Sequence, residues 1–193
     1  PFWIAFIIGV LLTAILSLVI ERTFLRPMVG EPVFSVAILT IGIDILLRTV
    51  LDNWIGLNPR YLGDPFPSIG NFGSVNIGGV VLKYLEISAF FTAVMVIILL
   101  SIFFKKSKYG VAMRATSYDQ EAALAQGIDV GKIFALVWFI AGLLASFAGF
   151  FITGGFNTLT QLSFISALRA LPAVVIGGLD SIPGAVVGSL IIG

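Results

Sequence analysis

Residues Lys105–Lys132, KKSKYGVAMRATSYDQEAALAQGIDVGK, are the longest stretch of this chain that a lipid bilayer would reject. The stretch lies between two strongly apolar segments, Leu85–Phe104 and Ile133–Ile152. It holds five basic residues: Lys105, Lys106, Lys108, Arg114 and Lys132. Such a segment is typical of a water-facing loop between two membrane-spanning helices, and its positive charge indicates the cytoplasmic side.

Within this loop, Ser117–Gly127 is predicted to form a short helix. Ser117 and Gln120 fit a Ser-x-x-Gln capping box at its start. Gly127 is the residue expected just past its end. The residues between the caps, Glu121, Ala122, Ala123, Leu124 and Ala125, are nearly all good helix formers. A short helix displayed at the cytoplasmic surface can dock into a groove on another protein; the alternative is a loop helix with no partner.

The composition indicates an integral membrane protein. Of 193 residues, 59% are hydrophobic and only 11% are charged, against about 25% charged in soluble domains. The chain has no Cys and no His, which excludes disulfides, zinc sites of the usual kinds and Ser-His-Asp triads. It has no G-x-x-x-x-G-K-[ST] phosphate loop, and no basic stripe with interleaved aromatic residues for nucleic acid. We therefore expect no bound cofactor and no metal.

Four apolar segments are predicted to span the membrane, namely residues 2–20, 33–51, 85–104 and 133–152. The first is long enough to cross a hydrocarbon core of roughly 30 Å at about 1.5 Å per residue. The predicted fold class is all-α, a polytopic bundle of transmembrane helices around the cytoplasmic loop 105–132. Pro27 and Pro32 are expected to end the helices that flank a short polar link, Glu21–Pro32. Alternating residues in Phe72–Leu82 suggest a short hairpin on the opposite, extracytoplasmic side.

The second apolar segment carries polar residues that could line a translocation pathway. Thr40, Asp44 and Arg48 lie within it, and Asp44 and Arg48 are four residues apart, so that they share a helix face and can pair. The alternative is an ion pair with a purely structural role.

Residues 166–193 are predicted to form a broken helix or a helix pair. Ser166–Ile176 is too short to span a membrane, and a Gly- and Pro-rich break follows it. The break is predicted to act as a hinge through Gly177, Gly178, Pro183 and Gly184. It fits a re-entrant segment surrounded by protein or a water-filled cavity, or equally a cytoplasmic turn between two spanning helices. Because the chain starts at Pro1 and stops inside an apolar run, we expect it to be a fragment.

Several motifs together resemble one family of transporters. Glu121-Ala122-Ala123, followed by Gly127, resembles the EAA-x-x-x-G motif of permease subunits in bacterial ABC importers. The runs Tyr109–Ala115, Phe147–Gly149 and Val175–Ala185 are similar in order and spacing to the high-affinity branched-chain amino acid permeases of those importers. The similarity covers nearly the whole chain.

This resemblance implies one half of a permease dimer in the bacterial cytoplasmic (inner) membrane. Its implied partners are cytoplasmic ABC ATPase subunits, a second permease subunit and an extracytoplasmic substrate-binding protein. It implies transport of branched-chain or related amino acids, with ATP hydrolysed by the separate ATPase. The implied coupling residues are Ser117, Glu121, Ala122, Ala123 and Gly127.

Other functions fit the same residues less well. A permease of this type could instead carry a sugar, a nucleoside, urea or an amide. An ion-coupled secondary transporter would use intramembrane carboxylates, for which Asp44 and Asp180 are the candidates. The same two residues are the only basis for an intramembrane aspartyl enzyme.

Overall fold

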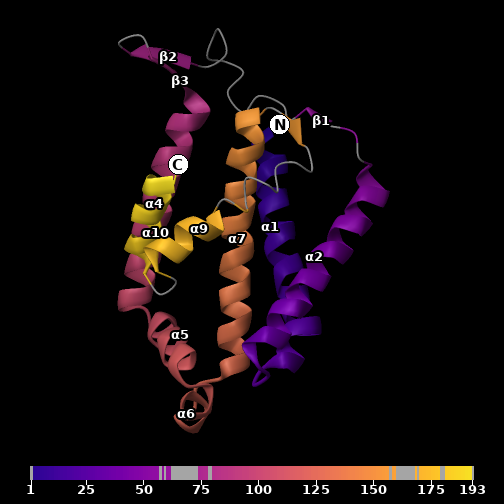
Figure 1. Ribbon diagram of the computed structural model, residues 1–193, viewed down its shortest axis with the longest axis vertical. Coiled ribbons are helices and arrows are strands. Elements are labelled where there is room, and N and C mark those ends of the chain that lie inside the picture. Colours follow the sequence, from indigo (N-terminus) through magenta and orange to yellow (C-terminus); the bar gives the residue numbers. More distant parts are fainter. Residues whose placement is uncertain are drawn as a thin grey trace. The chain divides into compact units, whose positions relative to one another are not determined.

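A computed structural model describes residues 2–56, 58, 60–61, 74–77, 80–156, 158–159, 168, 170–178 and 181–192. In this part of the chain, four helices are long and apolar enough to cross a membrane. They are α1 (Phe2–Ile20), α2 (Val33–Ile55), α4 (Tyr84–Lys106) and α7 (Val130–Phe156), labelled in Figure 1. The predicted all-α polytopic fold is thereby confirmed.

Shorter elements connect these helices. A π-helical turn η1 (Glu21–Leu25) and a 3₁₀ turn η2 (Arg26–Met28) follow α1, and α5 (Lys108–Tyr118) and α6 (Gln120–Ala125) lie between α4 and α7. The last described helices are α9 (Ala170–Gly177) and α10 (Ile182–Ile192). The antiparallel strand pairs are β1 (Arg60–Tyr61) with β4 (Thr158–Leu159), and β2 (Ser74–Ile77) with β3 (Val80–Lys83).

The long helices carry apolar side chains on all sides. Among the described side chains of α2 only Ile43 is buried, and α4 buries none of its residues. Phe34 on α2 and Phe91 on α4 are 75% and 66% exposed. A helix that is apolar all round requires an apolar environment, and so these surfaces are available to lipid or to other membrane subunits.

The chain divides into two compact units. Unit 1 comprises residues 1–58 and 103–148, and unit 2 comprises residues 59–102 and 149–193. Helices α4 and α7 contribute residues to both units.

In unit 1, α1 packs closely along α7, and Figure 1 shows the two helices side by side. The tightest approach is at Gly142, where an added Cβ would lie 2.7 Å from the Ser17 Cβ. The Ser17 hydroxyl donates a hydrogen bond of 2.7 Å to the Trp138 carbonyl, and the Phe6 and Phe147 rings meet edge to face at 5.5 Å. Small residues allow such backbone approach in lipid.

In unit 2, α9 and α10 form a tight helical hairpin. Both are far shorter than the roughly 20 residues that a spanning helix needs. A Cβ at Gly188 on α10 would overlap the Ala173 carbonyl on α9. Only glycine allows this separation between the two backbones.

The strand pair β2–β3 forms the hairpin that the sequence suggested. Val75 pairs with Leu82, and Ile77 pairs with Val80. Phe72, where the predicted alternation begins, lies outside the described residues.

Helical structure continues past two of the predicted helix ends. The link Glu21–Pro32 was expected to be a polar loop, but helical winding continues through η1 and η2 to Met28. The Arg26 amide bonds the Glu21 carbonyl, five residues back, so the turn widens and Pro27 is accommodated in the 3₁₀ turn. The segment 133–152 was expected to end near Ile152, but α7 continues to Phe156, and the Thr153 hydroxyl donates a hydrogen bond to the Gly149 carbonyl within the helix.

Candidate functional site

The loop between α4 and α7 contains a helix that sequence reasoning missed. Helix α5 is capped by Ser107, whose side chain accepts a hydrogen bond of 3.2 Å from the Tyr109 amide. An added Cβ on Gly110 would lie 2.6 Å from the Phe103 carbonyl oxygen, so α5 packs directly on the end of α4. The Arg114 guanidinium donates to the Phe104 carbonyl, where a cation is favoured at a helix C-terminus. Thus α5 is fastened to the end of α4.

Helix α6 begins later than predicted, and its cap is a different residue. The expected cap, Ser117, lies in the last turn of α5 and donates to the Arg114 carbonyl at 2.8 Å. Asp119 caps α6 instead, accepting from the Ala122 amide at 3.0 Å. Asp119 has extended backbone, which an N-cap requires. Ser117 is helical, and the predicted capping box with Gln120 is therefore wrong.

The predicted end of α6 is confirmed. Gly127 adopts a left-handed φ of +79°, which favours glycine. Its amide bonds the Leu124 carbonyl at 2.9 Å, and the Ile128 amide bonds the Ala123 carbonyl at 3.0 Å. These two bonds are the Schellman arrangement, and they turn the chain directly into α7.

Helix α6 has one inward face and one exposed face. Ala123 is buried at 3% exposure, whereas Glu121 and Ala122 are exposed and Leu124 is 55% exposed. Tyr118, which precedes the helix, is 90% exposed. Leu124 on α6 and Tyr118 at the end of α5 therefore present large side chains to the surroundings outside the membrane spans. Ala123 therefore lies on the inward face of α6.

The first turn of α7 is held by its own acidic cap. The Asp129 carboxylate accepts from the Lys132 amide at 3.0 Å and pairs with the Lys132 ammonium at 3.0 Å. These hydrogen bonds from Lys132 lower the pKa of Asp129, and the nearby Arg26 charge acts in the same direction. The cap fixes where α7 starts.

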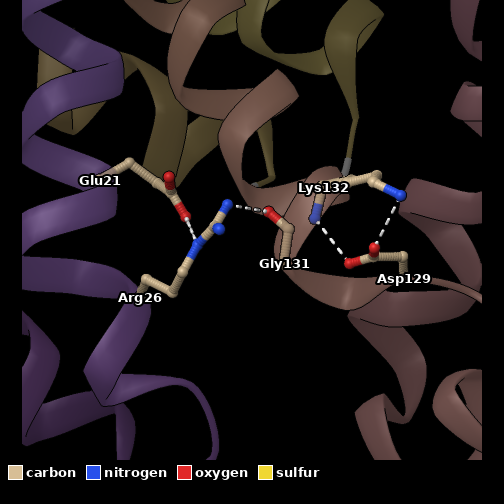
Figure 2. Close-up of polar contacts among 5 residues, drawn as sticks. All are labelled: Glu21, Arg26, Asp129, Gly131 and Lys132. Carbon is tan, nitrogen blue, oxygen red and sulfur yellow. Dashed lines mark hydrogen bonds and ion pairs between the residues drawn. The ribbon is translucent and has the colours of Figure 1, made fainter.

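A second polar cluster links this turn to α1 (Figure 2). The side chain of Glu21 is only 1% exposed, and the Arg26 Nε lies 3.3 Å from its Oε1. The same guanidinium donates through Nη2 to the Gly131 carbonyl at 3.1 Å. Sequence reasoning did not find this cluster. The π turn brings Glu21 and Arg26 together across a five-residue spacing, which no regular α-helical pattern predicts.

The proposed pathway residues on α2 are partly brought together. The Arg48 Nε lies 2.8 Å from the Asp44 Oδ2, so the predicted ion pair forms. Thr40 and Asp44 line a cavity of about 170 Å³ with Trp138 of α7. Thr40 also lines a cavity of about 320 Å³, again with Trp138. Arg48 lines neither cavity. A pathway role for these residues stays a prediction.

Trp138 of α7 was also not singled out by the sequence analysis. It also lines a third cavity, of about 220 Å³, with Gln120 and Ser117. The Gln120 Oε1 is buried there and accepts no hydrogen bond from the described residues. One tryptophan in an apolar run carries no signal of this position, because the cavities are formed by helices distant in sequence.

The four predicted hinge residues lie where α9 meets α10: Gly177 ends α9, Gly178 follows it, and Pro183 and Gly184 lie in the first turn of α10. Gly177 and Gly184 face each other so closely that a Cβ on either would overlap the backbone of the other. Gly178 has a φ of +89°. Pro183 is the second residue of α10, where its missing N–H is tolerated. A hinge motion here, and the choice between a re-entrant segment and a cytoplasmic turn, stay predictions; Asp180 lies outside the described residues.

Comparison with known proteins identifies one family of membrane permeases. Residues 1–193 match the family described as branched-chain amino acid transport system / permease component. The chain is 29% identical over 190 residues to the high-affinity branched-chain amino acid transport system permease protein BraD of Pseudomonas aeruginosa, covering 98% of this chain and 62% of that protein. It is 28% identical over 179 residues to the corresponding protein LivH of Salmonella typhimurium, covering 90% and 57%.

A shorter match is to a sugar transporter. The fructose import permease protein FruF of Bifidobacterium longum is 35% identical over 111 residues, covering 53% of this chain and 31% of that protein. No solved structure matches the chain. The chain spans about three fifths of the length of the branched-chain relatives.

Proposed function

The chain belongs to the family of branched-chain amino acid transport system permease components, and on that premise we propose that it is the membrane-spanning part of an ATP-driven importer. The relatives that match over nearly all of the chain are named as branched-chain amino acid permeases. We propose leucine, isoleucine or valine as the substrate, and the bacterial cytoplasmic membrane as its location.

The observation that carries the proposal is the construction of α6. Its two ends are closed, by the Asp119 cap and by the Gly127 turn, and its outer face presents Glu121, Ala122 and Leu124. A rigid helix with an exposed apolar and acidic face fits a groove on a cytoplasmic ATPase subunit. Glu121 would meet a basic or polar residue in that groove, and Ala122 would allow close approach.

The connections of α6 suggest how motion reaches the membrane. On one side, α5 is fastened to the end of α4 through Gly110 and Arg114. On the other side, the Gly127 turn leads within four residues into α7. Closure of two ATPase subunits around ATP would therefore displace α6 as a unit and tilt both helices. Rigid movement of packed helices is a common route for switching between inward-open and outward-open states.

The remaining partners are proposed because the chain belongs to a family of permease components. A second permease subunit would complete the pathway, and the exposed apolar surfaces of α2 and α4 are suited to contact it or lipid. A soluble binding protein would deliver the substrate on the side of the β2–β3 hairpin. No chemistry is assigned to this chain, since ATP hydrolysis belongs to the ATPase.

The test is reconstitution of the full-length permease with its ATPase and binding protein in liposomes. We expect ATP-dependent uptake of leucine, isoleucine or valine, and its loss in Glu121→Lys and Gly127→Leu with insertion unchanged. Lys108→Glu, a charge reversal at an exposed position at the start of α5, is the control and should transport normally. Uptake of fructose or ribose in place of the three amino acids would instead support the sugar permease alternative. Normal uptake by both α6 variants would refute the coupling role.

A further inference from the structure

The turn after α1 buries a carboxylate. Glu21 is one of the most deeply buried side chains among the described residues, at 1% exposure. A buried charge is tolerated only when it is paired and hydrogen-bonded. Its partner is Arg26, whose Nε lies 3.3 Å away. The π turn Glu21–Leu25 supplies the spacing that lets the two side chains meet, and such turns occur often at functional positions.

Arg26 has a second partner on a distant helix. Its Nη2 donates a hydrogen bond of 3.1 Å to the carbonyl of Gly131, 105 residues further along the chain. Figure 2 shows the guanidinium placed between the Glu21 carboxylate and this carbonyl. A planar guanidinium can serve two acceptors at fixed directions, which an ammonium group cannot do equally well. Arg26 therefore connects the end of α1 to the first turn of α7.

This connection continues a contact that runs along both helices. Ser17 bonds the Trp138 carbonyl, and Gly142 admits Ser17 and Ala14 at its surface. Phe6 and Phe147 meet toward the other end of the pair. The small-residue contact holds the middle of the two helices together, and the Arg26 contact holds their ends beside α6.

The contact between Arg26 and the Gly131 carbonyl lies close to α6 along the chain. Gly131 is the second residue of α7, and only four residues separate α7 from the end of α6. Any displacement of α6 reaches Gly131 before the rest of α7. We propose that Arg26, held by Glu21, is a positioning residue that makes α1 and α7 move as one body with α6. This inference rests on the proposed function of α6 in coupling.

A merely structural role for the pair makes a different prediction. If Arg26 only neutralises Glu21, a double variant in which both residues are replaced by neutral ones should insert and transport as wild type does. If Arg26 also transmits motion, the double variant Glu21→Gln/Arg26→Gln should insert normally and yet lose coupling, because no guanidinium reaches Gly131. Arg26→Lys, which keeps the charge but not the two-directional geometry, should fall between wild type and the double variant.

The first experiment measures uptake per ATP hydrolysed by the reconstituted full-length permease with its ATPase and binding protein. We expect the Glu21→Gln/Arg26→Gln variant to lose about tenfold or more in this ratio, as for loss of one hydrogen bond to a charged group. The control is Lys132→Gln, which removes the other ion pair of Figure 2 and leaves the Asp129 cap in place. An exposed pair contributes little, so this control should match wild type.

A second measurement follows the movement itself. The chain has no cysteine, so spin labels can be placed on cysteines introduced at Arg22 and Val137, which are both exposed. In the wild-type background the distance between them should be the same without nucleotide and with ATP trapped. In the neutral double variant it should change between the two states. A changing distance in the wild-type background, or full coupling in the double variant, would overturn the proposal. Absence of any ATP-driven uptake by wild type would instead overturn the proposed function.

Discussion

Replacement of Gly142 by alanine should destabilise the protein although it adds a single methyl group. The new Cβ would lie 2.7 Å from the Ser17 Cβ, 3.0 Å from its Oγ and 3.1 Å from the Ala14 Cα. Carbon atoms pack best at about 3.5–4.0 Å, and so α1 and α7 must separate by roughly 1 Å. The atoms in the way include α1 backbone, which cannot rotate aside.

The cost has two parts. Overpacking a close contact costs about 1–3 kcal/mol. Separation by roughly 1 Å would also break the 2.7 Å hydrogen bond from Ser17 to the Trp138 carbonyl, which adds about 1 kcal/mol. Against these, alanine gains about 1 kcal/mol over glycine within a helix. The expected net loss in the free energy of unfolding is about 1–3 kcal/mol.

The assay is reversible unfolding of the full-length permease in mixed detergent micelles, followed by circular dichroism. The matched control is Gly9→Ala on α1, the partner helix, where an added Cβ meets nothing within 4 Å. This control should be unchanged or slightly more stable than wild type, because only the helix propensity differs. Equal stability of the two alanine variants would refute the close packing of α1 on α7.

Three further predictions concern the two ends of α6 and the start of α7. Asp119→Ala should lower the stability of α6 by about 0.5–2 kcal/mol, the usual effect of losing an N-cap, whereas Ser117→Ala should have little effect. Hydrogen exchange of the Ala122 amide measures both effects, and equal protection of this amide in the two variants would contradict the assignment of Asp119 as the cap. Gly127→Ala should cost about 1 kcal/mol because the position requires a positive φ, while Gly131→Ala, where the nearest atom to an added Cβ is the Asp129 Oδ1 at 3.4 Å, should be tolerated. Thermal unfolding compares the two variants. Hydrogen bonds from Lys132 lower the pKa of Asp129, so the ionised Asp129 cap should be fully formed above the ordinary carboxyl pKa of about 4 and lost as the pH falls through the lower pKa of the folded protein. NMR titration of Asp129 should give a lower midpoint in wild type than in Lys132→Met, and equal midpoints would refute the interaction.

Sequence patterns predicted the features of this protein that depend on local composition. The lengths of the apolar runs predicted the four long helices, because crossing a membrane depends on the number of consecutive apolar residues. The pair of Asp44 and Arg48 followed from their four-residue spacing alone. Gly127 was recognised as the end of α6, because its left-handed backbone is a local requirement that glycine meets.

Competing local signals were harder to resolve. Ser117 and Asp119 are both acceptable N-caps by residue type, and the choice depended on α5, which extends through Ser117 and leaves Asp119 as the first extended residue. Similarly, Thr153–Phe156 contains two glycines and reads as a loop, yet it continues α7. Propensity is a weak preference that neighbouring structure overrides.

The membrane class, the long helices, the polar loop between α4 and α7 and the family follow from the amino-acid sequence, since each of these is the sum of many local preferences or motifs. The tertiary structure was needed to show which of the small residues on α7 is a contact: Gly142 meets α1, whereas Gly149 meets nothing within 4 Å. It also decided that Glu21 is buried and that Arg26 reaches Gly131. These are properties of helices that meet in space from positions more than 100 residues apart, and no local pattern of residues encodes which surfaces will meet.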